Sequence, residues 1–515
     1  MDPASFALSV FGTLDICIRY GHELIKLCRE IRTLPDDISD IALAIEGAWL
    51  KAESQLDLLK RLSRNNLLAP ALSAHYDEAL QRLRVKISGA VTGFEAVGKR
   101  SSPGIKIPQK LWMVHLKRHL ERVVGDLEDW QRRFDPSWFL ITLIASDRVD
   151  QQLDPRRHPG RNAAHLREIR EAVRQIALTE TRPDNNTTHS IFRSPTHVEE
   201  QRQQIPGTNN YLTRYVGDTS GREILLDGTN LTRSSAPTSK IHVRDLARLL
   251  SHVDPTTFSL LRCAGVIEVP TSDQDTQYQF IFEIPRGLRS PKTLRKLLIS
   301  SPRMSLSKRL QFAKQLARSV MFVHTTGFVH KSIRPETILI FNEEDQPSAS
   351  FLVGFERIRR AEARTDLLGD LEWERNLYRH PVRQGLWTDV AFIMQHDIYS
   401  LGVCLLEMAL WTSFVRHDDG TGINMPWADL VIRDAIRDKD ARRGGFAMKK
   451  ELVTIAKERL PMLVGDQYTE IVLACLCCLD GGEENIFADV KDNDDIVVGV
   501  RFIENVLEKL EDLHI

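Results

Sequence analysis

The segment HKSIRPET, residues 330–337, places an imidazole, two hydroxyls, a guanidinium and a carboxylate close together in the chain. General-base catalysis needs a group whose pKa lies near the working pH, and the hydroxyl of Ser332 is not such a group. Arg334 and Glu336 carry opposite charges two residues apart, so we expect them to form an ion pair within a loop. We interpret His330 as a buried structural histidine. The segment is rich in polar groups, yet Ser332 at its centre is not a proton acceptor near neutral pH.

Five segments resemble those of the protein-kinase family, in the same order and at similar separations. They are FEIP (282–285), LARSVMFVHTTGFVHKSIRPETILI (316–340), LVGF (352–355), YRHP (378–381) and DIYSLG (397–402). In the family such segments are the hinge, the αE helix with the catalytic loop, the strand before the metal-binding motif, the close of the activation segment and the αF signature. The resemblance covers roughly residues 210–514. It implies a small strand-rich lobe followed by a larger helical lobe.

The resemblance implies structural roles for the motif residues that are retained. His330 and Phe355 lie where kinases stack a hydrophobic spine between the lobes. Asp397 lies where the αF aspartate accepts hydrogen bonds from catalytic-loop amides. The full set of retained motif positions is His330, Arg334 (in place of the customary lysine), Phe355, Arg379, Pro381, Asp397 and Gly402.

The catalytic positions differ from the family pattern. Phosphoryl transfer depends on a few charged side chains and bound metal ions. The resemblance puts Ser332 where the catalytic aspartate would be, Thr337 at the metal-binding asparagine and Gly354 at the metal-binding aspartate. Mg²⁺ prefers carboxylate oxygen, and Glu356 is two residues away from the required position. We therefore expect no catalytic residue, no metal site and no carboxylate that could hold the cation.

The small lobe shows the same losses. There is no lysine between Arg148 and Lys240 and no glutamate between Glu223 and Glu268, so the phosphate-binding lysine and its ion-pair partner are both absent. VGDTSG, with Gly217 and Gly221, is the candidate for a glycine-rich loop, although two glycines also suit a plain hairpin turn. With Glu283 and Ile284 at the hinge, these are the candidate nucleotide contacts. We expect no cofactor, or weak ATP binding without metal.

The region between Gly354 and Pro381 has hydroxyls only at Thr365 and Tyr378. Its first half carries a cluster of arginines at Arg357, Arg359, Arg360 and Arg364. Such a cluster could receive a phosphate or contact a partner. The alternative interpretation is a solvated basic loop.

Helices are expected over the first 150 residues. Phe6, Val10 and Leu14 recur at four-residue spacing, which is typical of an amphipathic helix. A second helix should open at Thr33–Asp36, a third should follow Pro70, and a fourth should begin near Gln109. Four such helices with short connections predict a bundle. The fold class is therefore α+β, with a four-helix bundle followed by a two-lobed kinase-like domain.

Three regions follow from these patterns. Residues 1–150 form the bundle, and 151–209 hold a brace helix, near 165–180, and a flexible linker from 182. Residues 210–515 form the kinase-like domain, with its small lobe at about 210–285 and its large lobe at about 286–515. The linker prediction rests on a polar stretch that is nearly free of aliphatic residues.

The opening MDPASFALSVFGTLDICI resembles the start of HeLo and HeLo-like helical domains of fungal cell-death proteins, in which the first helix is implicated in membrane disruption. The order of bundle, brace and kinase-like domain also resembles the mixed-lineage kinase-domain-like proteins of necroptosis. The resemblance implies that Phe6, Val10 and Phe11 could face a membrane. Residues 82–133, with twelve Lys/Arg against five Asp/Glu, could add attraction to anionic lipid. The alternative is a bundle that only joins protein partners.

Composition bounds these hypotheses. With 69 basic and 70 acidic residues the net charge is −1, which argues against bulk binding to nucleic acid. Seven cysteines without regular spacing predict buried thiols. No basic leader precedes Asp2, so we expect a cytoplasmic protein that is recruited to a membrane if the bundle acts there. Protein partners are expected, and self-association could accompany activation.

Three functions remain open from the sequence. In the first, a catalytically inactive kinase-like domain controls the N-terminal bundle as a signalling or cell-death effector. In the second, both domains form a scaffold without membrane action. In the third, the chain is an atypical active kinase that uses Glu336 or Glu356 in unfamiliar roles.

Overall fold

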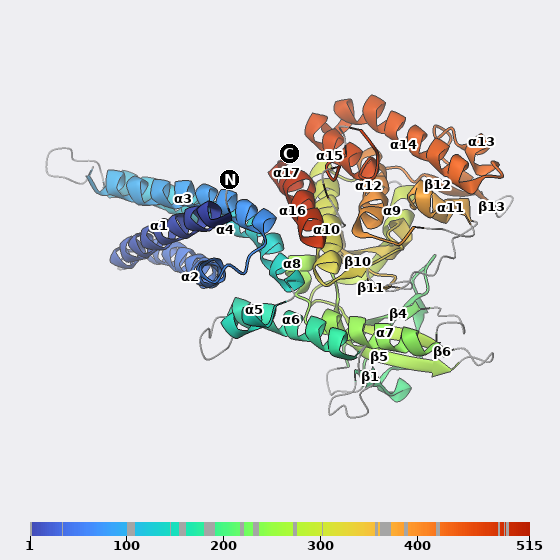
Figure 1. Ribbon diagram of the computed structural model, residues 1–515, viewed down its shortest axis with the longest axis horizontal. Helices are drawn as coiled ribbons and strands as arrows, with labels where there is room; N and C mark the ends of the chain where they lie inside the picture. Colours follow the sequence, from blue (N-terminus) through green and yellow to red (C-terminus); the bar gives the residue numbers. More distant parts are fainter. Residues whose placement is uncertain are drawn as a thin grey trace. The chain divides into compact units, whose positions relative to one another are not determined.

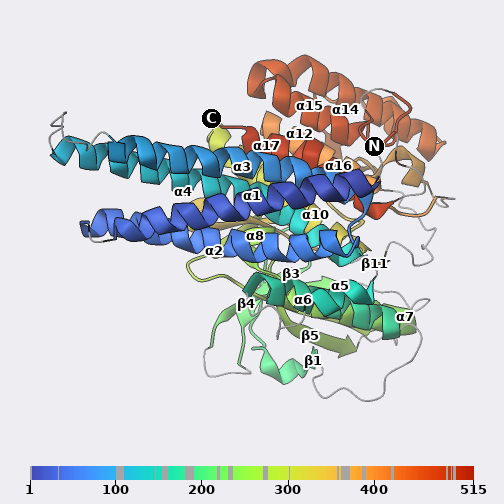
Figure 2. The same cartoon turned by 60° about the vertical axis from the view of Figure 1, so that its left-hand side comes forward.

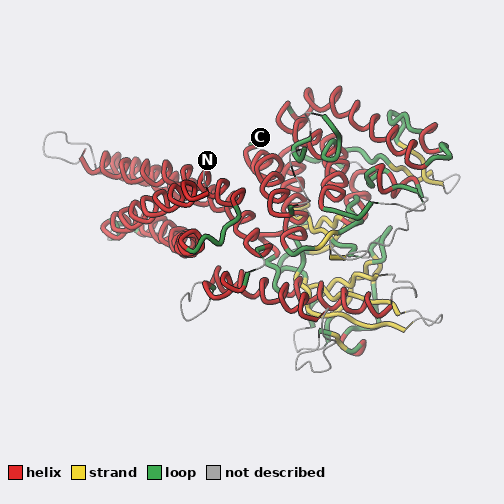
Figure 3. The backbone as a smooth tube through the Cα atoms, in the orientation of Figure 1, coloured by secondary structure: helices red, strands yellow, loops and turns green. Residues whose placement is uncertain are grey.

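The computed structural model describes residues 3–32, 34–99, 109–144, 146–153, 161–179, 191–216, 221–229, 236–270, 276–300, 302–355, 359–360, 372–385, 390–418, 423–482, 485–488, 490 and 494–514. The chain forms two compact units, Met1–Arg170 and Glu171–Ile515. The first unit is helical and the second contains the sheets, so the predicted α+β fold is confirmed (Figure 3).

Four long helices make up most of the first unit. They are α1 (Pro3–Glu30), α2 (Asp36–Arg64), α3 (Pro70–Lys99) and α4 (Gln109–Phe139). Figure 2 shows them lying side by side, with α1 in contact with α2 and α3, and α4 in contact with α2 and α3. Buried apolar side chains at three- and four-residue spacing hold the helices together, among them Trp49, Leu56, Tyr76, Leu80 and Leu120.

Helices α2 and α4 run in the same direction, as three cross-helix pairs show. Asp37 pairs with Lys117 at 2.9 Å, Ala48 accepts a hydrogen bond from Gln131 at 2.8 Å, and Lys51 pairs with Asp135 at 2.5 Å. The partners advance together along both helices. Helix α3, which lies between α2 and α4 in the chain, runs in the opposite direction to α4.

Shorter helices follow the bundle. They are η1 (Leu140–Leu143), α5 (Asp147–Gln152) and α6 (Arg161–Thr179). Arg170 of α6 binds the Asp150 carboxylate at 2.7 Å and the carbonyl oxygens of Ile141 and Ile144 at 2.6 and 3.0 Å. These contacts join α6 to α5 and to the end of η1. The predicted brace helix therefore exists, and its first half belongs to the compact unit of the bundle.

A six-stranded sheet begins the second unit, with the order β1-β5-β6-β4-β3-β2. Its strands are β1 (Phe192–Arg193), β2 (Gln203–Gln204), β3 (Asn210–Arg214), β4 (Glu223–Thr229), β5 (Arg262–Pro270) and β6 (Thr276–Glu283). Helix α7 (Ala236–Ser251) packs on one face against β5 and β6 (Figure 1). The short helix α8 (Pro255–Phe258) follows α7.

The sheet corrects the predicted linker. Residues 191–204 were expected to be flexible, but they contain β1, the turn η2 (Pro195–His197) and β2, all within the sheet. The small lobe therefore starts near Phe192, not at residue 210. The prediction failed because this segment is held by the buried side chain of Val198 and by backbone pairing at the two edges of the sheet. Neither gives the repeated apolar residues from which a strand is predicted. Residues 180–190 lie outside the described part.

Helices dominate the rest of the unit. They are α9 (Leu294–Ser300), α10 (Leu306–Thr325), α11 (Trp373–Asn376), α12 (Met394–Leu410), α13 (Arg433–Ile436), α14 (Ala441–Val464), α15 (Asp466–Leu476), α16 (Asp495–Phe502), η6 (Ile503–Leu507) and α17 (Glu508–Asp512), with short turns at η4 (Pro335–Thr337) and η5 (Pro381–Arg383). Strands β7 (Arg289–Thr293), β9 (Ile338–Glu343) and β10 (Gln346–Leu352) form a three-stranded sheet, and the pairs β8 (Phe328–Val329) with β11 (Arg359–Arg360) and β12 (Val415–Asp418) with β13 (Ile423–Pro426) complete the lobe.

Helix α12 lies at the centre of this lobe. Nearly all of its residues are buried, and a side chain at Gly402 would come within 2.7 Å of the Cβ atom of Cys475, so glycine permits the close approach of α15. The seven cysteines are all buried and free, as predicted. Among the described residues, no helix has both the length and the apolar character needed to cross a bilayer.

Candidate functional site

Hydrogen bonds to a residue of α12 hold the loop that carries His330. The carboxylate of Asp397 accepts hydrogen bonds from the amides of His330 and Lys331 at 2.6 and 2.9 Å, which is the contact expected of this aspartate. His330 Nε2 donates to the carbonyl oxygen of Val353 at 3.1 Å, and its Nδ1 accepts from the amide of Ser332 at 3.3 Å. Burial lowers the pKa of His330 to about 3, so the ring is neutral. It serves as a structural element.

His330 and three phenylalanine rings from both lobes form one aromatic cluster. Phe355 lies with its ring centroid 5.0 Å from that of His330, and Phe280 and Phe282 of β6 lie 6.5 and 6.0 Å from Phe355. All four rings are buried. This packing joins the six-stranded sheet to the helical lobe and fixes the chain on either side of Gly354.

The methyl group of Thr337 fills the space where a side chain at residue 354 would lie. Thr337 Oγ1 donates toward the carbonyl oxygens of Ser332 and Arg334, at 2.8 and 2.9 Å, so it acts within the loop. Gly354 has φ +80°, and a Cβ atom built on it would lie 2.4 Å from Thr337 Cγ2. A side chain at residue 354 would therefore need both a left-handed backbone and the removal of the threonine methyl group.

A carboxylate from the small lobe lies beside Gly354, a placement that the sequence patterns did not predict. Asp227 on β4 is buried, and its Oδ2 accepts the amides of Gly354 and Phe355 at 2.7 and 3.4 Å. The sequence-based expectation was that no carboxylate here could hold a metal ion, and it did not include the placement of Asp227 beside Gly354. The signal available was the unusual aspartate inside the apolar run EILLDG.

The donor set around Asp227 does not fit a magnesium ion. Its carboxylate oxygen already accepts two N–H groups, whose positive ends would face a cation. Thr337 directs its hydroxyl to backbone carbonyls and Gly354 has no side chain. Across the described ranges, no group of three or more His, Cys, Asp or Glu side chains is arranged to hold a metal.

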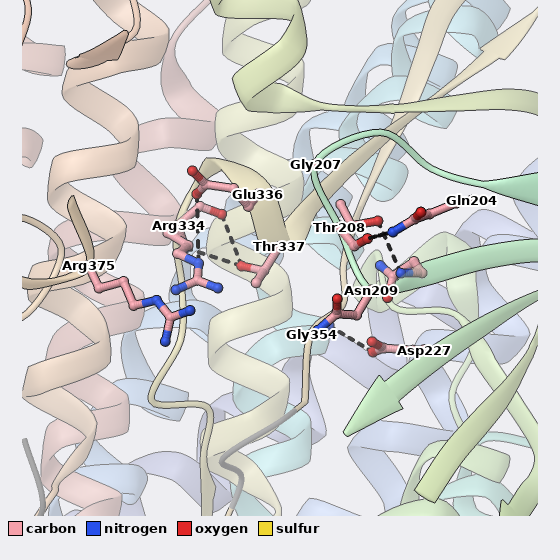
Figure 4. A pocket seen from close by; sticks show the side chains of 11 residues that line it. Gln204, Gly207, Thr208, Asn209, Asp227, Arg334, Glu336, Thr337, Gly354 and Arg375 are labelled. Carbon is pink, nitrogen blue, oxygen red and sulfur yellow. Dashed lines mark hydrogen bonds and ion pairs between the residues drawn. The ribbon is translucent and has the colours of Figure 1, made fainter. Parts of the chain in front are cut away.

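These residues border a cavity of about 390 Å³ between the two lobes. Figure 4 shows the loop around Gly207 and Thr208 on one side and the side chains of Arg334 and Arg375 on the other. The lining residues are Gln204, Gly207, Thr208, Asn209, Asn210, Asp227, Arg334, Glu336, Thr337, Gly354 and Arg375. The cavity is polar and carries both signs of charge.

The loop over this cavity is not the one predicted. VGDTSG falls between β3 and β4 in the chain; Gly221 is not among the residues that line the cavity, and Gly217 lies outside the described residues. The lining loop follows β2 and contains Gly207 with φ +78°. It was missed because a single glycine in a stretch assigned to a linker gives no motif. Glu283 pairs with Arg222 at 2.9 Å, and neither it nor Ile284 lines the cavity.

Glu336 is bound mainly by Arg295 of α9, which the sequence analysis did not single out. Arg295 pairs with Glu336 and with Glu407, both at 2.9 Å, and donates to the Tyr378 hydroxyl at 2.6 Å. The predicted pair of Arg334 with Glu336 is longer, at 3.7 Å. Burial alone would raise the pKa of Glu336, but the charges of Arg295 and Arg334 outweigh it and hold that pKa below the usual range. Glu336 is therefore an ionised structural partner.

The remaining predicted positions are structural or lie outside the description. Tyr378 is buried, with its hydroxyl bound to Arg295 and Glu407, which leaves it inaccessible for phosphorylation in this fold. Pro381 starts η5, and the carbonyl oxygen of Arg379 accepts from Gln384 at 2.8 Å. Thr365, Glu356, Arg357 and Arg364 and the side chains of Arg359 and Arg360 lie outside the described residues.

The predicted membrane-facing residues lie in the bundle. Val10 is fully buried, and Phe11 is half-buried with Lys60 and Arg64 over its ring at 5.4 and 4.7 Å. Lys60 also pairs with Asp15. The side chain of Phe6 lies outside the described part. Helix α1 therefore contributes its apolar face to the core in this conformation.

Comparison with known proteins gives one partial likeness. No protein-family model matches the chain. Over 136 residues, it is 28% identical to a protein of Clostridium acetobutylicum described as a probable serine/threonine-protein kinase. The match covers 26% of this chain and 19% of that protein, so the chain spans less than a fifth of its relative's length. The comparison supports kinase-like signalling in general terms.

Proposed function

We propose that this chain is a signalling protein in which a kinase-like unit without phosphotransfer activity controls the N-terminal helical bundle. The observation that carries the proposal is the mutual packing of Thr337 and Gly354, with Asp227 bound to the amides beside them. Phosphoryl transfer relies on side chains that neutralise charge on the phosphates and metal. Here the corresponding space is filled by a methyl group and by hydrogen bonds internal to the protein.

Nucleotide binding, where it occurs, is weak and independent of metal. Arg334 and Arg375 could meet phosphate oxygens in the cavity, whereas Asp227 would repel them. Affinity depends on how many phosphate oxygens find a donor in the site. A site that carries both positive and negative side chains offers few such donors without repulsion. A thermal-shift titration of the full chain with ATP should therefore give a small shift that Mg²⁺ does not increase. A shift that requires Mg²⁺ would contradict this part of the proposal.

A direct assay tests the absence of transfer. The purified full chain is incubated with labelled ATP and Mg²⁺ or Mn²⁺, beside the variants Asp227→Asn and Ser332→Ala. We expect no transfer from any of them. Labelling that Asp227→Asn abolishes would instead identify this carboxylate as a functional metal ligand, and would favour the alternative of an atypical active kinase.

The bundle is proposed as the effector module of a cell-death or related response, acting on an anionic membrane when α1 leaves its core. The basic residues Lys60 and Arg64 beside Phe11 support attraction to such a surface once exposed. Self-association on activation and recruitment from the cytoplasm belong to the same proposal. The alternative is a scaffold that binds protein partners through both units.

Vesicle leakage separates these two functions. Residues 1–179, which include all of α1–α6, should release dye from vesicles of anionic lipid, whereas the full chain should release less. Phe11→Glu should abolish leakage. Val85→Glu is the control, because Val85 is 65% exposed on α3 and leaves the core unchanged. Intact vesicles with the wild-type fragment, together with partners that require both units, would favour the scaffold.

A further inference from the structure

Residues 191–204, which we call the strap, run from one edge of the six-stranded sheet to the other and pair with a strand at each edge. At the first edge, Phe192 and Arg193 pair in parallel with Val266 and Ile267 of β5. The amide of Val266 donates to the Ile191 carbonyl oxygen at 3.0 Å. The strap therefore covers an edge of β5 that would otherwise expose unpaired backbone groups.

Gly265 has no side chain, which lets this end of the strap approach β5 closely. A Cβ atom at Gly265 would lie 2.6 Å from Arg193 Cγ and 2.9 Å from the Ile191 carbonyl oxygen. Its φ of +155° lies at the margin of the range that L-residues rarely adopt. Arg193 Nε also donates to the carbonyl oxygen of Ala264 at 3.3 Å. The sequence of β5 thus leaves room for a segment 70 residues earlier in the chain.

Val198 anchors the middle of the strap. It is buried in a cluster with Ile224, Leu226, Ile267 and Ile281, which come from three strands. Because side chains alternate along a strand, Ile224 and Leu226 face the strap while Leu225 and Asp227 face the other side of the sheet. Most other strap residues are exposed. Val198 is the one strap residue that is buried, and Ile191 and Phe192 are half-buried, so few apolar side chains hold this segment.

Backbone bonds then carry the strap along β3. The amide of Glu199 donates to the Arg214 carbonyl oxygen at 3.0 Å, and Thr213 Oγ1 donates to the carbonyl oxygens of Glu199 and Gln201 at 3.1 and 3.0 Å. The strap ends as β2, where Gln203 and Gln204 pair with Leu212 and Tyr211. It therefore supplies both edge strands of the sheet.

The cavity loop starts at the residue where the strap ends. Gln204 is the last residue of β2 and already lines the cavity, and its Nε2 donates to the Thr208 carbonyl oxygen at 2.8 Å. Ile205 donates its amide to the Asn210 carbonyl oxygen at 2.9 Å, which closes the loop. No residue separates β2 from the loop, whose first residue, Ile205, is buried, so the pairing of β2 fixes where the loop begins.

We infer that the strap is a releasable support for the cavity, so that undocking Val198 and opening the loop at residues 204–210 are one event. A segment held by few buried contacts opens at lower free energy than the whole fold. The strap follows α6 in the chain, after residues 180–190. The inference stands whether or not the bundle acts on membranes.

Hydrogen exchange of the full chain tests the inference with Val198→Ala. Removing this anchor should speed amide exchange roughly tenfold both in the strap and at residues 203–210. Glu200→Ala is the matched control on the same segment, because Glu200 is exposed. It should leave exchange at residues 203–210 unchanged.

A second variant keeps the test valid if Val198→Ala weakens the whole unit. A disulfide introduced with Gln203→Cys and Leu212→Cys, whose positions are paired between β2 and β3, should restore slow exchange at residues 205–210 in the Val198→Ala background. Exchange at 195–201 should remain fast. The inference is overturned if Val198→Ala speeds exchange at 195–201 while residues 203–210 keep the wild-type rate, or if the disulfide does not restore protection.

Discussion

A Cβ atom at Gly354 would lie 2.4 Å from Cγ2 of Thr337, so these two residues exclude any larger pair at their positions. The resemblance to kinases leads one to expect a polar metal ligand at each position, and either difference alone looks small. Together with the Asp227 carboxylate on the Gly354 amide, they form a packed and hydrogen-bonded junction between the lobes. A larger side chain at either position therefore requires a change at the other.

The first prediction concerns this packing. Gly354→Ala should destabilise the second unit by about 3 kcal/mol, because it adds an overpacked methyl group to the strain of positive φ. Gly287→Ala is the matched control: its φ is +88°, but a Cβ there would meet only Glu343 Oε1 at 3.7 Å. It should cost about 1 kcal/mol. Urea unfolding of the full chain measures both.

Thr337→Ser completes a double-mutant cycle with Gly354→Ala, since it removes Cγ2 and keeps the hydroxyl. The double variant should regain a large part of the lost stability. Additive costs would show that the two side chains do not compete for space.

The second prediction concerns Asp227. Asp227→Ala leaves the amides of Gly354 and Phe355 without this acceptor in a buried site, which should cost about 3 kcal/mol. Asp227→Asn keeps an oxygen acceptor and should cost about half as much. Thermal melting compares the two variants. Equal losses would mean that the charge, and not the hydrogen bonds, sets the stability of this junction.

The third prediction concerns Arg295. Arg295→Ala would leave Glu336 and Glu407 without their shared partner inside the protein, at a cost of about 3–5 kcal/mol. Tyr378→Phe removes only a hydroxyl that bonds both Arg295 and Glu407, and should cost about 1–2 kcal/mol. Arg289→Ala, which breaks an exposed pair with Asp345, is the control and should cost under about 1 kcal/mol. A similar effect for all three arginine and tyrosine variants would refute the buried network.

The fourth prediction concerns pH. Burial lowers the pKa of His330 and His396 to about 3 and that of His380 to about 2. The unfolded chain binds protons to these rings below about pH 6.5, whereas the folded chain does not, so stability is retained above that pH and falls as pH decreases. Each ring contributes up to about 1.4 kcal/mol per pH unit in this range.

Urea unfolding between pH 7.5 and 5 measures this slope. His396→Asn keeps an acceptor for the Ile393 amide, which His396 Nδ1 binds at 3.0 Å, and removes one titrating ring. The slope should decrease by about one third of the contribution from the three rings. His514→Gln removes an exposed ring and serves as the control. An unchanged slope in His396→Asn would show that other groups cause the acid sensitivity.

Much of the fold could be predicted from local patterns. The four helices follow from apolar spacing and from Pro35, Pro70 and the break before Gln109, because helix signals act over a few residues. The kinase-like order of segments predicted the second unit, and the αF aspartate pointed to the contact of Asp397 with the loop. The strap was missed because its order comes from edge pairing and one anchor, Val198, which depend on strands far away in the sequence.

The sequence by itself determined which chemical groups are present at residues 332, 337 and 354, because residue identity needs no coordinates. Only the tertiary structure decided which groups meet there. It brought Asp227 from the small lobe onto the Gly354 amide, and it added Arg295 to Arg334 as a partner of Glu336. The physical reason is that hydrogen bonds and ion pairs depend on distances set by packing of whole elements, and no local pattern in the chain encodes those distances.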